Sequence, residues 1–253
     1  MKTLAIIPAR YASTRFPGKP LALLGGKPVI EWVWGCVGKL PILTGAVVAT
    51  DDERIAEAVR AFGGRVMTTS KEHRSGTDRC GEVLRRMEET GERYDVVINV
   101  QGDEPFLQPE QLESLTECFE DENTQIATLK APIREKAELF SPNTVKVVCD
   151  RRERALYFSR QPIPHLRGAE ADEWLERGMY YKHVGIYAFR ASTLKEVVEL
   201  PQTPLELSES LEQLRWMENG YSIRLRTTDA ANIGIDTPED LAAAEKYLAN
   251  KKR

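Results

Sequence analysis

A chain of 253 residues can bury a sizeable hydrophobic core, either as one large domain or as a domain with a substantial insertion. Its composition, 42% hydrophobic and 29% charged, is typical of soluble globular proteins, and its net charge of −4 argues against a general nucleic-acid-binding protein. No apolar stretch is long enough to cross a bilayer, and the N-terminal apolar run is too short for a signal-peptide core. We therefore expect a cytoplasmic protein that binds neither nucleic acid nor a membrane.

The N-terminal segment predicts a strand that opens into a basic loop. Leu4–Ile7 has the length and composition of a buried strand, and Pro8 ends it. The loop that follows carries Arg10, Arg15 and Lys19, with no acidic residue among them. Fixed cations and free backbone N–H groups at the end of a strand suit a polyphosphate. The competing interpretation is a solvated basic loop, because most charge clusters are solvated.

Strands and helices alternate through the first half of the chain. Strands are expected at residues 46–50, 65–69 and 94–100, and helices at residues 28–37, after Asp51-Asp52, after the loop 71–79 and at residues 109–119. This alternation indicates an α/β fold with a mostly parallel central sheet. Ligands of such sheets bind beyond the carboxyl ends of the strands, where the basic loop and Asp103 both lie.

The alternation of strands and helices ends near residue 126. Several strand-like runs follow, with little helix between them. We interpret residues 126–219, approximately, as a β-rich insertion in a core formed by residues 1–125 and 220–253. A helix expected at residues 208–219 would place Glu209 and Gln213, four residues apart, on one face. Thr237 and Pro238 are typical of the start of a closing helix.

The cysteines give no sign of a disulfide framework or of a metal site. No C-x-x-C pair occurs, and the three histidines have no metal-ligand spacing to any cysteine. Reduced thiols are the expected state of all four. They are Cys36, Cys80, Cys118 and Cys149.

Two aspartates are candidate metal ligands. Asp103 follows the most apolar strand, and Asp236 lies between a short apolar stretch and the closing helix. Two carboxylates at strand ends could hold Mg²⁺ together with substrate phosphates. Taken singly, each aspartate also fits an ordinary turn or loop residue. The glycine-rich motifs of P-loop and dinucleotide-binding proteins and the G-x-S-x-G motif of hydrolases are absent from the sequence.

Five segments in order, IIPARYASTRFPGKPL, HRSGTDR, NVQGDEP, HVGIYAFR and NIGIDTPEDL, make the chain similar to the 3-deoxy-manno-octulosonate cytidylyltransferases, or CMP-Kdo synthetases. The resemblance covers nearly the whole chain. It implies a Rossmann-like central sheet of the nucleotide-diphospho-sugar transferase type, the substrates CTP and 3-deoxy-D-manno-octulosonate (Kdo), Mg²⁺ as cofactor and a homodimer. It also implies that the product, CMP-Kdo, serves lipopolysaccharide synthesis and that pyrophosphate is released.

The resemblance further implies roles for individual residues. Lys19, Arg15, Asp103 and Asp236 would be catalytic, and the two aspartates would bind the metal. The residues expected to bind CTP are Pro8, Ala9, Arg10, Ser13, Arg15, Lys19, Arg74, Ser75, Gly76, Thr77 and Gln101. The residues expected to bind the sugar acid are Arg160, His183, Tyr187, Glu209, Gln213 and Asn232.

Alternatives stay open on the sequence. The phosphate-side segments do not separate Kdo from a sialic acid or from 8-amino-Kdo as the acceptor. A non-catalytic nucleotide-sugar sensor could use the same scaffold, although a sensor has no need for paired metal ligands. His183, before the resemblance is counted, fits a structural histidine as well as a ligand-binding one.

Overall fold

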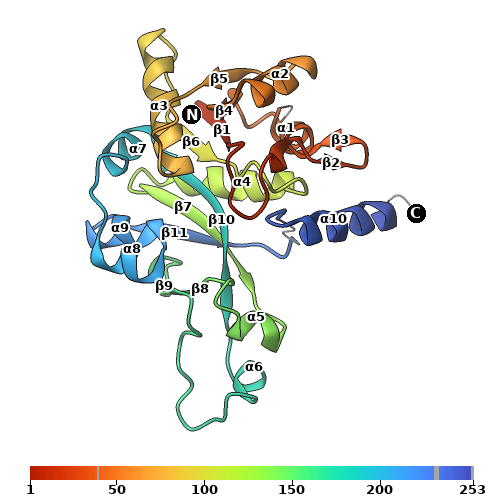
Figure 1. The fold of residues 1–253 in the computed structure, drawn as a ribbon. Helices are drawn as coiled ribbons and strands as arrows, with labels where there is room; N and C mark the ends of the chain where they lie inside the picture. Colours follow the sequence, from red (N-terminus) through yellow and green to blue (C-terminus); the bar gives the residue numbers. More distant parts are fainter. Residues whose placement is uncertain (39, 231–233, 252–253) are drawn as a thin grey trace. The chain divides into compact units, whose positions relative to one another are not determined.

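The computed structural model describes residues 1–38, 40–230 and 234–251, and their contacts divide the chain into two compact units. The first unit contains residues 1–113 and 231–253, and the second contains residues 114–230. Figure 1 labels the elements of both. None of the helices in the described ranges is long and apolar enough to cross a membrane.

The first unit is built on four parallel strands in the order β6-β1-β4-β5. Their bounds are β1 Thr3–Ala9, β4 Gly45–Thr50, β5 Val66–Thr68 and β6 Val96–Asn99. Leu4–Ile7 and most of the central residues of β4 and β6 are fully buried, which explains their continuous apolar runs. Because these strands run in parallel, β1 and β6 deliver the segments that follow them to the same edge of the sheet.

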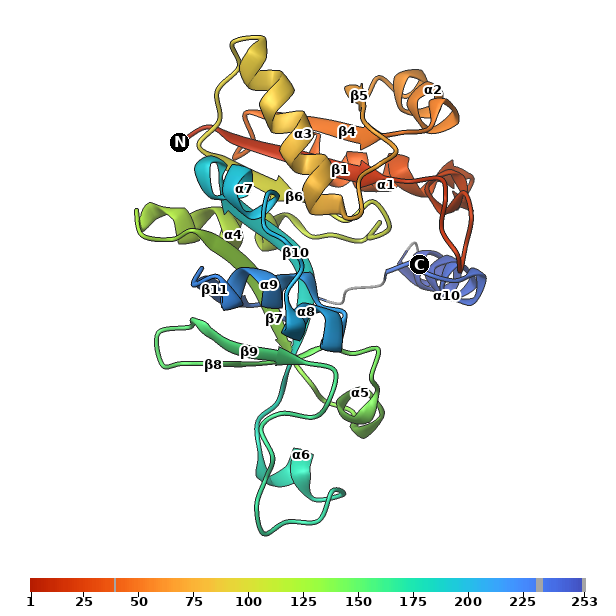
Figure 2. The ribbon, with the colours of Figure 1, turned by 60° about the vertical axis from the view of Figure 1, so that its left-hand side comes forward.

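Helices cover this parallel sheet. Figure 2 shows α3 crossing the strands, and the contacts place α3 against β1, β4 and β6, α1 against β1, and α2 against β4 and β5. Asp52 caps α2, and Thr237 caps α10 through a hydrogen bond with Asp240. The elements are α1 Val29–Val37, α2 Glu53–Ala61, α3 Gly76–Glu89 and α10 Pro238–Lys251, with the short η1 Lys19–Leu21 and the hairpin β2 Leu23–Leu24 and β3 Lys27–Pro28.

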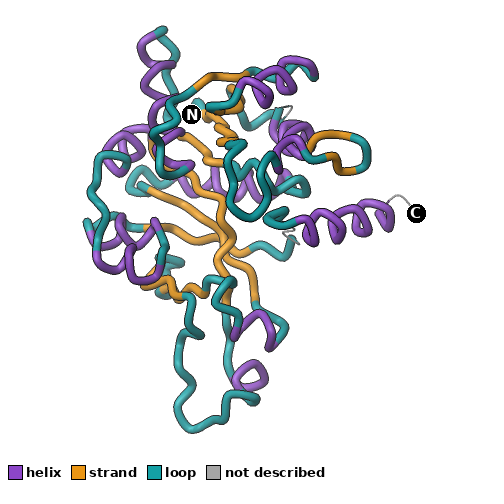
Figure 3. The backbone as a smooth tube through the Cα atoms, in the orientation of Figure 1, coloured by secondary structure: helices purple, strands orange, loops and turns teal. Residues whose placement is uncertain are grey.

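The second unit is mixed. In it β11 pairs in parallel with β7, and β7 pairs antiparallel with β10, which continues to β8 and β9. Long loops connect its elements, and one of them carries the single turn of α6 (Figure 3). The strands are β7 Ile126–Pro132, β8 Lys146–Cys149, β9 Ala155–Ser159, β10 Tyr181–Arg190 and β11 Ile223–Thr227. The helices are η2 Cys118–Glu120, α5 Lys136–Phe140, α6 Trp174–Arg177, α7 Ala191–Val197, α8 Pro204–Glu209 and α9 Glu212–Glu218, and α4 Pro109–Glu117 carries the chain into this unit.

The predicted α/β class with a mostly parallel central sheet is confirmed, and all four cysteines are free. Two helix predictions were wrong in detail. Helix α3 begins at Gly76 rather than after the loop 71–79, because Ser75 and Asp78 form a capping box. The single helix expected at residues 208–219 is two helices, because Ser210 adopts the left-handed conformation with φ 51° and ends α8. Glu209 and Gln213 therefore do not share a helix face.

Candidate active site

A pocket of about 370 Å³ lies in the first unit, at the carboxyl ends of β1 and β6. Eight of the eleven residues predicted to bind CTP line it, together with both candidate metal ligands. Arg74, Ser75 and Thr77 do not, although they adjoin Gly76, which does. The lining residues are Pro8, Ala9, Arg10, Ala12, Ser13, Thr14, Arg15, Lys19, Pro20, Gly76, Gln101, Gly102, Asp103 and Asp236.

The basic loop that forms one wall of the pocket is closed on itself. The Gly18 N–H donates to the Tyr11 carbonyl oxygen at 2.8 Å, and Gly18 has φ +73°, which favours glycine. The Arg54 guanidinium stacks on the Tyr11 ring, 3.3 Å from its centroid. This closure sets Lys19 at the start of η1 with its side chain directed into the pocket.

Lys19 lies between the two predicted metal ligands. Its Nζ donates to Asp236 Oδ1 at 2.9 Å and, at closer range, to Asp103 Oδ2. Arg15 pairs with the other oxygen of Asp236 at 2.9 Å. Burial lowers the pKa of Lys19, but the charges of the two aspartates and the hydrogen bonds to them outweigh burial and raise it. Lys19 is therefore a fixed cation in this site.

The pKa of Asp236 agrees with this arrangement. Burial opposes ionisation of Asp236, yet its hydrogen bond to Lys19 and the charges of Lys19 and Arg15 hold its pKa below the ordinary value. Nearby, burial first and then the charges of Asp103 and Asp236 raise the pKa of Glu104 to about 8. Glu104 is therefore mostly protonated at neutral pH, and Lys19 and Arg15 balance the charges of the two aspartates.

Backbone contacts bring the aspartates together across a long stretch of chain. The Ile235 N–H donates to the Asp103 carbonyl oxygen at 2.9 Å, and the Asp236 N–H donates to Asp240 Oδ2 at 3.0 Å. Gly102 is required beside Asp103, because a Cβ there would lie 2.6 Å from the Pro8 carbonyl oxygen. The ends of β1 and β6 can therefore approach closely enough to share one pocket.

These contacts allow a test of whether the residues fit a metal. Both carboxylates reach the same ammonium nitrogen, so a single cation can contact both. Mg²⁺ is commonly held by one or two carboxylates with substrate phosphates completing its shell. In the described part of the chain, no cluster of three or more His, Cys, Asp or Glu residues could hold a metal by itself. The residues fit a divalent ion that arrives with a phosphorylated substrate.

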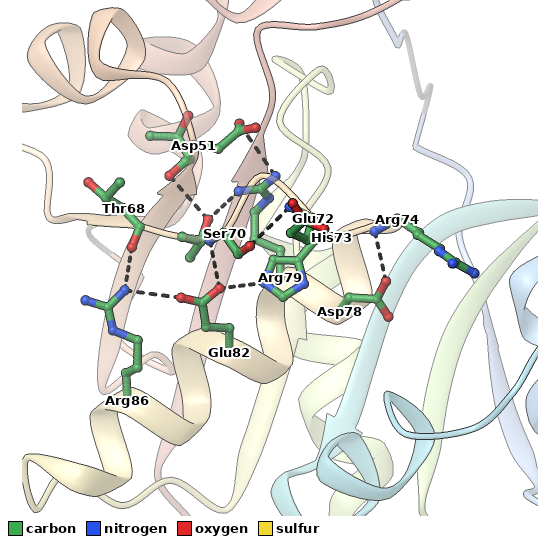
Figure 4. A network of polar contacts seen from close by, with 12 residues as sticks. Asp51, Thr68, Ser70, Glu72, His73, Arg74, Asp78, Arg79, Glu82 and Arg86 are labelled. Carbon is green, nitrogen blue, oxygen red and sulfur yellow. Dashed lines mark hydrogen bonds and ion pairs between the residues drawn. The ribbon is translucent and has the colours of Figure 1, made fainter.

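The loop before α3 is held against that helix by a polar network (Figure 4). The Asp78 carboxylate accepts from the N–H groups of Arg74, at 3.2 Å, and Ser75, at 3.0 Å. The Arg10 guanidinium, from the other wall, donates to the carbonyl oxygens of His73 at 3.4 Å and Arg74 at 3.0 Å. Residues 74–77, which are predicted to bind CTP, are thus tied to Arg10 of the basic loop through backbone groups.

Two further side chains on α3 complete this network, and sequence reasoning assigned neither. Glu82 accepts from the Ser70 N–H at 2.9 Å and pairs with His73 Nε2 at 2.5 Å. Arg79 is fully buried, donates to Thr69 Oγ1, and lies 3.5 Å from Asp51. Burial lowers the pKa of Arg79. The motif HRSGTDR could have indicated the burial of Arg79. This arginine follows the capping residue Ser75 by four positions and falls on the buried face of α3.

In the second unit, the structure brings Arg160 and Glu209 together. The Arg160 N–H donates to Glu209 Oε2 at 2.9 Å, and its Nε donates to the Glu209 carbonyl oxygen at 2.6 Å. Beside them the fully buried Lys146 donates to the carbonyl oxygens of Ser141, at 2.9 Å, and Arg160. The sequence analysis did not single out Lys146. Its position between two valines in a predicted strand was the one feature that could have indicated a buried lysine.

His183 and Tyr187 form a second group on β10, with ring centroids 5.2 Å apart. Burial lowers the pKa of His183 to about 3, so the imidazole is neutral at neutral pH, and its Nε2 lies 3.0 Å from Thr128 Oγ1. Within the described ranges, the buried Gln213 Nε2 has no hydrogen-bond partner. Asn232, the sixth predicted sugar-binding residue, lies outside the described residues.

Comparisons with known proteins agree with this architecture. Residues 4–224 match a family model described as cytidylyltransferase. The 3-deoxy-manno-octulosonate cytidylyltransferase of Parabacteroides distasonis is 55% identical, over 99% of this chain and all of that protein. That of Bacteroides thetaiotaomicron is 56% identical over the same shares. A solved CMP:2-keto-3-deoxy-manno-octonic acid synthetase complexed with CTP superposes with a TM-score of 0.91, at 43% identity over 99% of this chain and 100% of that one.

Proposed function

The chain belongs to the family of 3-deoxy-manno-octulosonate cytidylyltransferases, and we propose that it transfers CMP from CTP to Kdo, with release of pyrophosphate and Mg²⁺ as cofactor. The observation that carries this proposal is the meeting of Lys19, Asp103 and Asp236 in the pocket of the first unit. Cations for a triphosphate and paired carboxylates for its metal occur there together. A cytoplasmic homodimer remains part of the same proposal.

The reaction is a substitution at phosphorus. The anomeric hydroxyl of Kdo attacks the α-phosphorus and gives up its proton to solvent, the bond from that phosphorus to the bridging oxygen breaks, and pyrophosphate leaves with the electron pair. Enzymes accelerate such transfers mainly by positioning and by electrostatic stabilisation. Arg10, Arg15 and Lys19 line the pocket and neutralise the phosphates, and Lys19 balances the charge that builds up as pyrophosphate leaves. Asp103 and Asp236 would hold Mg²⁺, which would supply Lewis-acid stabilisation of the phosphate oxygens.

The second unit supplies the sugar-acid side in this proposal. Neutral His183 can exchange hydrogen bonds with Kdo hydroxyls, and Gln213 offers a buried amide with unused donor capacity. Hydrogen bonds between Arg160 and Glu209 fix both residues in place, so that side chains near them keep a fixed geometry.

The test of the proposal is pyrophosphate release from CTP with different acceptors, with and without Mg²⁺. We expect turnover with Kdo that depends on Mg²⁺ and that exceeds turnover with a sialic acid or 8-amino-Kdo. A nucleotide-sugar sensor would bind CTP and release no pyrophosphate with any acceptor. Preference for another sugar acid would keep the reaction class and overturn the assignment of the acceptor.

A second prediction follows from the network in Figure 4. Replacing Glu82 by alanine removes the acceptor for Ser70 N–H and the partner of His73, so the loop before α3 loses its anchor. We expect CTP affinity, measured by calorimetry, to fall about tenfold, because one or two hydrogen bonds that organise the loop are lost. Glu89→Ala, an exposed change on the same helix, is the matched control. Equal CTP affinity in the two variants would show that the loop does not depend on Glu82.

A further inference from the structure

The second unit contains a pocket that the proposed function does not use. It has a volume of about 210 Å³ and lies where β7 and β11 begin, beside the turn between β8 and β9. Ile126 and Thr124 are its buried residues, and the other positions carry charged or polar side chains. Its lining residues are Asp121, Asn123, Thr124, Ile126, Arg152, Arg154, Ser222 and Arg224.

The lining of this pocket has an excess of positive charge. Three guanidinium groups, from Arg152, Arg154 and Arg224, face one carboxylate, that of Asp121. The Asp121 Oδ1 atom is already occupied, because it accepts from both the N–H and the Nδ2 of Asn123 at 3.0 Å. Those two hydrogen bonds first, and then the charge of Arg224, lower the pKa of Asp121. Asp150, which does not line the pocket, pairs with Arg154, so the charges of Arg152 and Arg224 face the single carboxylate of Asp121.

The turn between β8 and β9 holds two of these arginines in place. Asp150 accepts from the N–H groups of Arg152, at 2.8 Å, and Arg154, at 2.9 Å, and it also pairs with the Arg154 side chain at 2.8 Å. Glu153 has φ 60°, a left-handed conformation that is costly for a residue other than glycine, and its carbonyl oxygen accepts from the Leu225 N–H at 2.7 Å. The turn is thus fixed to β11, the strand that carries Arg224.

The pairing of the β8–β9 turn with β11 places two arginines opposite each other. Arg154 and Arg224 are partners in an antiparallel bridge, and like charges at opposed positions destabilise a sheet. The Arg152 side chain, within the described ranges, has no carboxylate partner. An anion in the pocket would remove this repulsion. Guanidinium forks also match the oxygen geometry of a phosphate group, and Thr124 adds a hydroxyl donor.

We propose that this pocket of the second unit, formed by Arg152, Arg154 and Arg224, is a binding site for a small phosphate-bearing anion, separate from the CTP pocket. Inorganic phosphate and pyrophosphate share the chemistry that the site recognises. The inference does not depend on the proposed function, because the two pockets have no residue in common.

The test is calorimetric titration of phosphate, and in a second arm pyrophosphate, into protein saturated with CTP in the absence of Kdo. Saturation keeps the added anion out of the CTP pocket, and no turnover occurs without the acceptor. We expect one binding event that Arg152→Ala and Arg224→Met each weaken by about tenfold, since each loses one charge-assisted contact. The arm with the tighter binding identifies which anion the site prefers.

Arg151→Ala is the matched control, because it removes one positive charge from the same turn and Arg151 does not line the pocket. It is expected to bind the anion as the unchanged protein does. Melting temperatures verify that Arg152→Ala, a change at an exposed side chain, leaves the fold intact. No binding to the unchanged protein at millimolar anion, or equal weakening in all three variants, would overturn the proposal.

Discussion

Replacing Asp103 or Asp236 by asparagine is expected to lower kcat for pyrophosphate release roughly 10²- to 10³-fold, because a bound metal contributes several kcal/mol of charge stabilisation. Asparagine keeps the shape of each side chain and removes its charge. Both carboxylates contact Lys19 Nζ, so each is placed to contact a metal at the same point. Steady-state kinetics at saturating CTP and Kdo, over a range of Mg²⁺ concentrations, provide the measurement.

Binding gives a second readout that is independent of turnover. The stabilisation that Mg²⁺ adds to CTP in thermal melting should largely disappear in both variants, since a ligand raises stability only as far as it binds the folded state. Asp52→Asn is the matched control, because Asp52 lies after the neighbouring strand β4 and asparagine is an equally good helix cap. Full activity and an unchanged Mg²⁺ effect in Asp103→Asn or Asp236→Asn would remove that residue from the metal site.

Replacing Lys19 by alanine is the second change with a large expected effect. In the proposed reaction Lys19 acts on the phosphates, whose charge is redistributed as pyrophosphate leaves, so its interaction with them should be strongest in the transition state. We expect kcat to fall roughly 10²- to 10³-fold, as for removal of a preorganised donor. Lys27→Ala, which removes an exposed lysine paired with Glu31, should leave kcat unchanged. A purely raised KM for CTP in Lys19→Ala would indicate ground-state binding alone.

We expect His183→Ala to change other kinetic constants than Lys19→Ala does. It removes a neutral, half-buried imidazole from β10 of the second unit, so we expect a higher KM for Kdo with little change in kcat. His183→Gln, which keeps a polar group, is the companion variant, and its melting temperature separates lost ligand contacts from a damaged core. A loss of kcat equal to that of Lys19→Ala would mean that His183 acts in the chemical step.

Local rules made the strands, the caps and the basic loop predictable from sequence. Buried parallel strands show continuous apolar runs, as in β1 and β6, and capping by Thr237 explains why α10 begins at Pro238. Because parallel strands end at one edge, sequence reasoning could also expect the segments after Ala9 and Asn99 to lie near one another.

Long-range contacts and single backbone torsions were not predictable in the same way. Lys19 contacts residues 84 and 217 positions away, and no local pattern specifies that one ammonium group should hold both aspartates. The left-handed torsion of Ser210, which divides a helix predicted at residues 208–219, is uncommon for serine and depends on packing. The burial of Arg79 likewise depends on Thr69 and Asp51, which belong to other elements.

In the proposed function the CTP phosphates bind in the pocket of the first unit, whereas binding of the sugar acid depends on residues of the second unit. Calorimetric CTP affinity without Kdo, measured for the unchanged protein, Lys19→Ala and His183→Ala, tests this claim most directly. We predict that Lys19→Ala weakens CTP binding and that His183→Ala binds CTP as the unchanged protein does. Equal weakening of CTP binding by the two substitutions would contradict the division of substrates between the two units.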